Sequence, residues 1–140
     1  MTSKLLLRIA SFISLVFAAG HTLGGFTDWS PMGANAVLDS MRKVHFQTMG
    51  VSRSYLDFFI GFGWSLSIGM LLQATLLWFI ATLAERDPEL ARPMIAAFAL
   101  NCAASVAITS LWLFPVPALF AILLLVPLVL AWFATGRTPA

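Results

Sequence analysis

The chain has 140 residues, of which 60% are hydrophobic and only 10% are charged, and its formal net charge is +2. Soluble domains carry about 25% charged residues, so this composition excludes an ordinary soluble protein. The basic residues are scattered along the sequence rather than clustered, which excludes a nucleic-acid-binding surface.

Four long apolar stretches predict four transmembrane helices, because about 20 apolar residues cross a hydrocarbon core of about 30 Å. The second stretch contains no charged residue between Asp57 and Glu85. We therefore expect an all-α, polytopic membrane protein in which residues 1–140 form a single four-helix-bundle domain. The predicted spans are Leu5–Phe26, Phe58–Leu83, Met94–Phe114 and Ala118–Ala134.

The first stretch has a second interpretation. Lys4 and Arg8 precede an apolar run that ends in Ala18-Ala19-Gly20, which is also the pattern of a cleavable signal peptide. We expect this segment to be retained as the first membrane helix.

The longest connection, between the first two stretches, is predicted to hold a short amphipathic helix at the outer membrane surface. Five residues recur there at helical spacing, and the charged side chains of Asp39, Arg42 and Lys43 fall largely off their stripe. We expect Gly50 to end this helix and Trp29 to anchor the loop at the interface. The stripe consists of Val37, Leu38, Met41, Val44 and His45.

Two local signals precede the second stretch. Ser54 and Asp57 have the spacing of a capping box, in which each side chain bonds the backbone N–H of the other, although Asp replaces the usual Glu. Arg53 and Asp57 are four residues apart, so on a helix they would share a face and form a surface ion pair.

Prolines mark the ends of the later helices. Asp87 and Pro88 predict an N-cap and a first helical turn, with Pro93 as an irregularity near the start of the third helix. Pro115-Val116-Pro117 predicts a tight connection, so the last two helices should be antiparallel neighbours.

Stripes of small and polar residues predict which helix faces meet, because such residues allow close approach and hydrogen bonds between helices in a bilayer. We expect the stripes of the first three helices to face one another, and Gln73 to bond Asn101. The fourth helix has no stripe and should lie at the periphery. The stripes are Ser11, Ser14, Ala18 and His21; Asp57, Gly61, Ser65, Gly69 and Gln73; and Ala97, Asn101, Ser105 and Thr109.

The side of the membrane that holds both termini carries more Lys and Arg than the opposite side. Because cytoplasmic loops are enriched in these residues, we expect both termini in the cytoplasm and the protein in a bacterial inner (plasma) membrane. The two sets are Lys4, Arg8, Arg86, Arg92 and Arg137 against Arg42, Lys43 and Arg53.

Polar and ionisable residues gather at the outer ends of the first two helices. Such groups are costly in a membrane and therefore usually have a partner or a role. We expect a ligand-binding cluster there, with Gln73 and Asn101 as further candidates at comparable depth in the membrane. The outer candidates are His21, His45, Arg53, Tyr55 and Asp57.

The sequence predicts no metal site and no cofactor. Its two histidines lack a His-x-x-x-His or haem-attachment spacing. The single cysteine, Cys102, is expected to be a buried structural residue.

Two motifs resemble a pattern in a group of small bacterial four-helix integral membrane proteins. They are His21-Thr22-Leu23-Gly24-Gly25 and Arg53-Ser54-Tyr55-Leu56-Asp57-Phe58-Phe59-Ile60-Gly61-Phe62-Gly63. The resemblance implies the order of four helices, draws attention to His21, Arg53 and Asp57, and implies no activity. Four-helix drug exporters differ, because they rely on an acidic residue within the first helix. A sterol-isomerase-like four-helix family is similar in architecture only.

Three functions fit these observations. The first is binding of a lipid or another lipophilic molecule, or of a membrane partner, at the outward-facing polar cluster. The second is a membrane-embedded enzyme on a lipophilic substrate, with proton transfer by His21, His45, Tyr55 and Asp57 and an anionic head group on Arg53. The third is small-solute transport by a homo-oligomer, because four helices with one charged cluster make a poor pathway alone.

Overall fold

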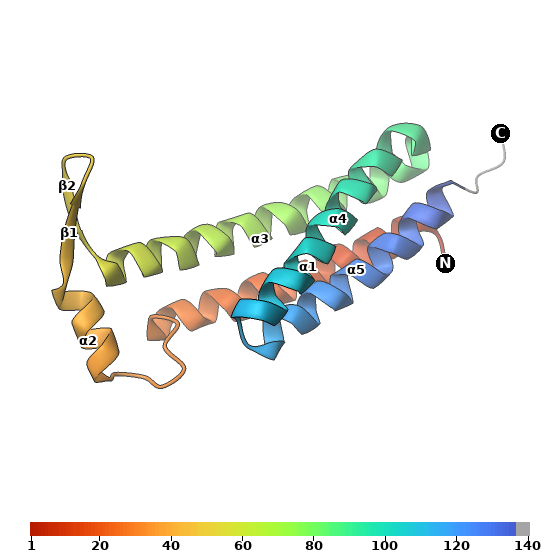
Figure 1. The fold of residues 1–140 in the computed structure, drawn as a ribbon. Coiled ribbons are helices and arrows are strands. Elements are labelled where there is room, and N and C mark those ends of the chain that lie inside the picture. Colours follow the sequence, from red (N-terminus) through yellow and green to blue (C-terminus); the bar gives the residue numbers. More distant parts are fainter. Residues whose placement is uncertain (137–140) are drawn as a thin grey trace. The chain divides into compact units, whose positions relative to one another are not determined.

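The computed structural model describes residues 1–136, and Arg137 therefore lies outside the described residues. The chain is predominantly helical, which confirms the all-α prediction apart from one small antiparallel hairpin (Figure 1). The elements are α1 (Ser3–Gly24), the short 3-10 helix η1 (Gly25–Thr27), α2 (Ala36–Lys43), β1 (His45–Thr48), β2 (Val51–Ser54), α3 (Tyr55–Arg86), α4 (Pro88–Trp112) and α5 (Pro115–Thr135).

Four of these helices, α1, α3, α4 and α5, are long and apolar enough to cross a membrane, as predicted. The start of α4 is also as predicted, since the N–H of Leu90 donates to Asp87 Oδ1 at 2.9 Å. The helix continues through Pro93. In α5, Pro115 and Pro117 occupy the first turn, where a missing N–H costs nothing, and the connection from α4 is only Leu113 and Phe114. Pro127 lies inside the helix.

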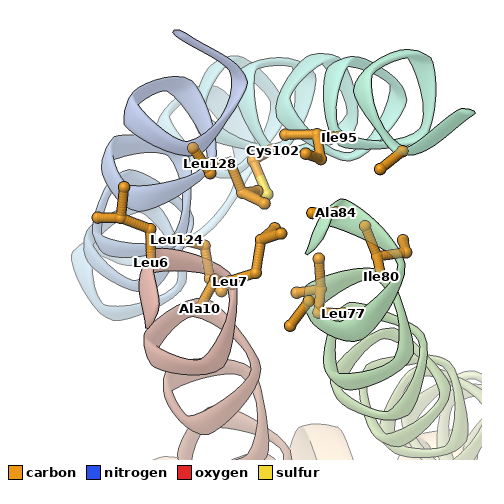
Figure 2. Close-up of a cluster of buried hydrophobic side chains, with 13 residues drawn as sticks. Leu6, Leu7, Ala10, Leu77, Ile80, Ala84, Ile95, Cys102, Leu124 and Leu128 are labelled. Carbon is orange, nitrogen blue, oxygen red and sulfur yellow. The ribbon is translucent and has the colours of Figure 1, made fainter. Parts of the chain in front are cut away.

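The described chain divides into two compact units, one made of residues 1–17 with residues 71 onward, and the other of residues 18–70. Figure 2 shows the apolar core of the first unit, to which all four long helices contribute. Leu7 of α1, Leu77 of α3, Ile95 of α4 and Leu128 of α5 are completely buried there. Close packing of these side chains holds the helices together.

The predicted peripheral position of the fourth apolar helix is wrong. In α5, residues Leu124, Leu128 and Ala131 belong to the core of the first unit (Figure 2). α4 is the most exposed of the long helices, with 11% of its most apolar window buried against 28% for α5. The small alanines of α5 allow close packing, and the buried polar residue of this helix, Thr135, lies at its end.

The stripes of the second and third predicted helices do not form the core either. Ala97 and Asn101 are exposed on α4, whose buried residues are Ala91, Ile95 and Cys102. Residues spaced strictly by four rotate about 40° per step around a helix, so such a stripe leaves any single face. Within residues 1–136 no hydrogen bond joins Gln73 to Asn101, so that prediction is wrong.

The stripe of the first helix is buried, as predicted, at Ser11, Ser14 and Ala18. Its spacing alternates between three and four, which keeps it on one face. In the first unit the hydroxyl of Ser11 donates to the backbone carbonyl of Ala74 at 2.7 Å, and it thereby connects α1 to α3.

Polar contacts at one end of the first unit place the start of α1 beside the end of α3. Lys4 Nζ lies 2.8 Å from Glu85 Oε2 in an exposed ion pair. Arg8 donates to Thr82 Oγ1 at 3.1 Å, and its guanidinium carbon lies 3.1 Å from the centre of the Trp78 ring. The two helices are therefore antiparallel in this unit.

The second unit contains a hairpin that was not predicted. Asn35 caps α2 by accepting from Val37 and Leu38, and the helix ends at Lys43, before the two last residues of the predicted stripe. β1 and β2 then pair, with Phe46 opposite Arg53. Gly50 does not end a helix but forms the tight turn together with Met49, at φ values of 81° and 48°.

We predict that Ser11→Ala destabilises the protein by about 0.6–1.7 kcal/mol, the range measured for hydrogen bonds between membrane helices. The reason is the loss of the bond to the Ala74 carbonyl. Thr75→Ala is the control, because its hydroxyl is exposed and bonds only its own helix, at Leu71. Unfolding in mixed detergent micelles measures both variants, and equal stability of the two would contradict the predicted contact.

Candidate functional site

The predicted capping box joins the end of β2 to the start of α3 and is confirmed. The backbone N–H of Ser54 donates to Asp57 Oδ2 at 2.9 Å, and the N–H of Asp57 donates to Ser54 Oγ at 3.0 Å. Ser54 is buried, whereas Asp57 is exposed. These bonds satisfy two backbone donors and fix the Asp57 carboxylate at the first turn of α3.

The predicted ion pair between Arg53 and Asp57 is absent from the described residues. Arg53 belongs to β2 rather than to a helix, so the i,i+4 geometry does not apply. One terminal nitrogen of Arg53 donates to the carbonyl of Ser52 at 3.0 Å. Arg53 and Asp57 are nevertheless neighbours, because both line the same groove.

This groove, which we call the α3 groove, has a volume of about 320 Å³ and is open to the outside. Its size lies at the lower end of the range for small-molecule sites, about 300–1,000 Å³. Two charged residues lie next to two aromatic rings and a strip of small residues. The lining residues are Arg53, Asp57, Phe58, Gly61, Phe62 and Ser65.

Aromatic rings connect the hairpin to the wall of the α3 groove. The ring centre of Phe58 lies 4.8 Å from that of Phe62 and 5.9 Å from that of Phe46. Phe46 also contacts Tyr55, at 5.1 Å between ring centres. Gly61 lies between the two wall residues on the helix, and no part of the chain lies within 4 Å of the position where its Cβ would be.

Two of the sequence candidates lie at the hairpin beside Asp57. His45 is paired with Ser54 across the hairpin, and it is one of the charged or ionisable neighbours of Asp57. Its Nδ1–H donates to the carbonyl of Lys43 at 2.9 Å, which leaves the other ring nitrogen available. Tyr55 is exposed and contacts Phe46 through its ring.

His21 belongs to a different part of the second unit. Its Nδ1 lies 3.0 Å from the hydroxyl of Ser67, which follows Asp57 by ten residues, or about 15 Å of helix. Of the predicted His21, His45, Tyr55 and Asp57, His21 therefore lies apart from Asp57, whereas His45 and Tyr55 lie near it. Gln73 and Asn101 lie in the first unit and line no part of the α3 groove.

Trp29 packs beside His21, with their ring centres 5.4 Å apart. The indole N–H of Trp29 donates to the carbonyl of His21 at 2.9 Å, and its ring lies 5.3 Å from that of Trp64. Three glycines surround this indole: a Cβ added at Gly63 would lie 2.5 Å from a ring carbon, and at Gly24 or Gly25 the distance would be 2.9 Å. Gly24 and Gly25 of the first motif and Gly63 of the second therefore make room for one tryptophan.

Among residues 1–136, no group of three His, Cys, Asp or Glu side chains could hold a metal ion. The α3 groove is amphipathic, with the cation Arg53 and the anion Asp57 at its polar end. Such a groove can bind a molecule that combines a charged head with an apolar body.

We predict that Gly63→Ala destabilises the protein by about 1–3 kcal/mol, because the added methyl group would displace the indole of Trp29. Gly69→Ala on the same helix is the matched control, since its Cβ position is open, and it should be neutral or slightly stabilising. Thermal unfolding in detergent, followed by tryptophan fluorescence, measures both. Equal melting temperatures would contradict the packing around Trp29.

Comparisons of the chain with protein-family models, with curated proteins and with solved structures found no match.

Proposed function

We propose that this chain is an integral membrane protein that binds a lipid or another lipophilic molecule in the α3 groove. Support for membrane insertion comes from large apolar side chains on the surfaces of the long helices. Phe12, Phe79 and Leu100 are 66%, 63% and 71% exposed. Exposed apolar surface on this scale is unfavourable in water, whereas a bilayer accepts it.

The observation that carries the binding proposal is the composition of the α3 groove. Arg53 and Asp57 lie where α3 begins, and Phe58 and Phe62, whose rings contact each other, continue the groove along the same helix. The Cβ position of Gly61, which also lines the groove, is open. A lipid has the same order of groups, a charged head followed by an apolar chain. Binding sites of this type combine mainly apolar walls with a few placed polar groups.

The length of α3 supports a position of this polar end among the lipid head groups. With 32 residues α3 is about 48 Å long, close to the 40–45 Å of a bilayer including its head groups. The other long helices have 21–25 residues and match the hydrocarbon core alone. We place the protein in a bacterial inner membrane with both termini in the cytoplasm, on the distribution of Lys and Arg.

The alternative functions have less support from the geometry. An enzyme that uses His21, His45, Tyr55 and Asp57 together would need all four at one reacting group, and His21 bonds Ser67, about 15 Å along α3 from Asp57. A membrane partner or a second copy would meet α4 rather than α5, because α4 exposes the stripe that contains Ala97 and Asn101. Transport by an oligomer would require the same contact.

We predict that Gly61→Leu weakens lipid binding, because the new side chain would occupy the α3 groove, while its Cβ meets no other part of the chain. The control is Gly69→Leu, two turns further along α3, which is equally open and lies outside the groove. Native mass spectrometry of delipidated protein, titrated with dioleoyl phospholipids, measures the bound fraction. Wild type and Gly69→Leu should bind, and Gly61→Leu should lose about tenfold in affinity.

The same titration can reject the proposal in two ways. Wild-type protein that retains no phospholipid above the level of detergent adducts would overturn it. So would Gly61→Leu binding as tightly as Gly69→Leu, because the groove would then not be the site.

A further inference from the structure

The two charges of the α3 groove point to one class of ligand. We propose that the groove selects a zwitterionic phospholipid head group, with the phosphate on Arg53 and a primary ammonium group on Asp57. This inference rests on the proposed function and adds the class of lipid to it.

Both charged side chains have unused hydrogen-bonding capacity. Asp57 uses Oδ2 as the acceptor for the Ser54 N–H, and Oδ1 has no partner among the described residues. Arg53 uses one nitrogen for the carbonyl of Ser52, and its other donors have no partner in residues 1–136. A guanidinium with free N–H groups favours a phosphate, and a carboxylate with a free oxygen favours an N–H donor.

The absence of an ion pair between these two residues is central to this choice. Opposite charges that line one groove without bonding each other leave a positive and a negative position open at the same time. A purely anionic head group would satisfy Arg53 but would be repelled by Asp57. A zwitterionic head group satisfies both, because a short linker holds its phosphate and its ammonium together.

The carboxylate also distinguishes between two zwitterionic head groups. A primary ammonium can donate a hydrogen bond to Asp57 Oδ1, whereas a quaternary ammonium has no N–H and would need an aromatic cage. The groove offers only two rings, Phe58 and Phe62, and they are packed edge to face at 82° rather than arranged around a cation. The geometry thus favours an ethanolamine-type head group over a choline-type one.

The capping box provides a control that separates the charge of Asp57 from its structural role. Asp57→Asn keeps an oxygen that can accept from the Ser54 N–H, so the helix cap remains while the negative charge is lost. Ser54→Ala removes the acceptor for the Asp57 N–H but leaves the carboxylate in place. A loss of selectivity caused by the charge should appear in the first variant alone.

The experiment is a titration of delipidated protein with dioleoyl phosphatidylethanolamine, phosphatidylcholine and phosphatidylglycerol, followed by native mass spectrometry. These lipids share their acyl chains and differ only in the head group. Wild type and Ser54→Ala should bind phosphatidylethanolamine about tenfold more tightly than the other two, which is the effect of one hydrogen bond to a charged group. Asp57→Asn should lose this preference, and Arg53→Gln should bind all three lipids more weakly.

The outcomes separate this inference from the proposed function. If wild type binds the three lipids equally while Gly61→Leu still weakens binding, the groove is a lipid site and the head-group selectivity is wrong. If Gly61→Leu has no effect on any lipid, both proposals fail. Competition with soluble glycerophosphoethanolamine is the last arm: failure to compete at high concentration would show that the head group alone is not recognised, and would overturn the assignment of the two charges.

Discussion

The reciprocal hydrogen bonds between Ser54 and Asp57 determine where the hairpin ends and where α3 begins. A helix leaves its first backbone N–H groups without partners, and near a membrane such groups are costly to leave unsatisfied. The capping box satisfies two donors with two side chains. It also holds one carboxylate at a defined position, so the interaction that starts the helix orients half of the polar end of the α3 groove.

Two glycines of α3 that lie on different faces of the helix, Gly61 and Gly63, have different roles. Gly63 and Ser67 are buried and face His21 near the end of α1 and Trp29 in the loop that follows it. Gly61, only two residues before Gly63, points to open space and forms part of the groove. The absence of a side chain therefore permits close packing against Trp29 at Gly63 and leaves room for a ligand at Gly61.

The first unit is held together mainly by the close fit of small and medium-sized apolar side chains. In the bilayer location that we propose, burial of apolar surface is not a driving force, so packing and a few polar contacts between helices would carry the stability. Ser11 supplies one such polar contact to α3, and Lys4 with Glu85 supplies an exposed pair at the end of the unit. α4 contributes fewer buried residues than the other long helices, and its outward face bears the polar Asn101.

The sequence by itself determined the helical class, the four long apolar helices, the cap at Asp87 and the capping box at Ser54, because length, hydrophobicity and local spacing decide these features. It also predicted that Arg53 and Asp57 are neighbours, and both line the α3 groove. Only the tertiary structure decided which helix faces meet. A strict spacing of four, as in Gly61, Ser65 and Gly69, rotates by about 40° per step and does not stay on a packed face. The hairpin was not predicted for a different reason: Met49 occupies a turn position with positive φ, where Asn, Asp or Gly would have indicated the turn. Pairing of the two strands and the ring contacts of Phe46 with Tyr55 and Phe58 stabilise the hairpin.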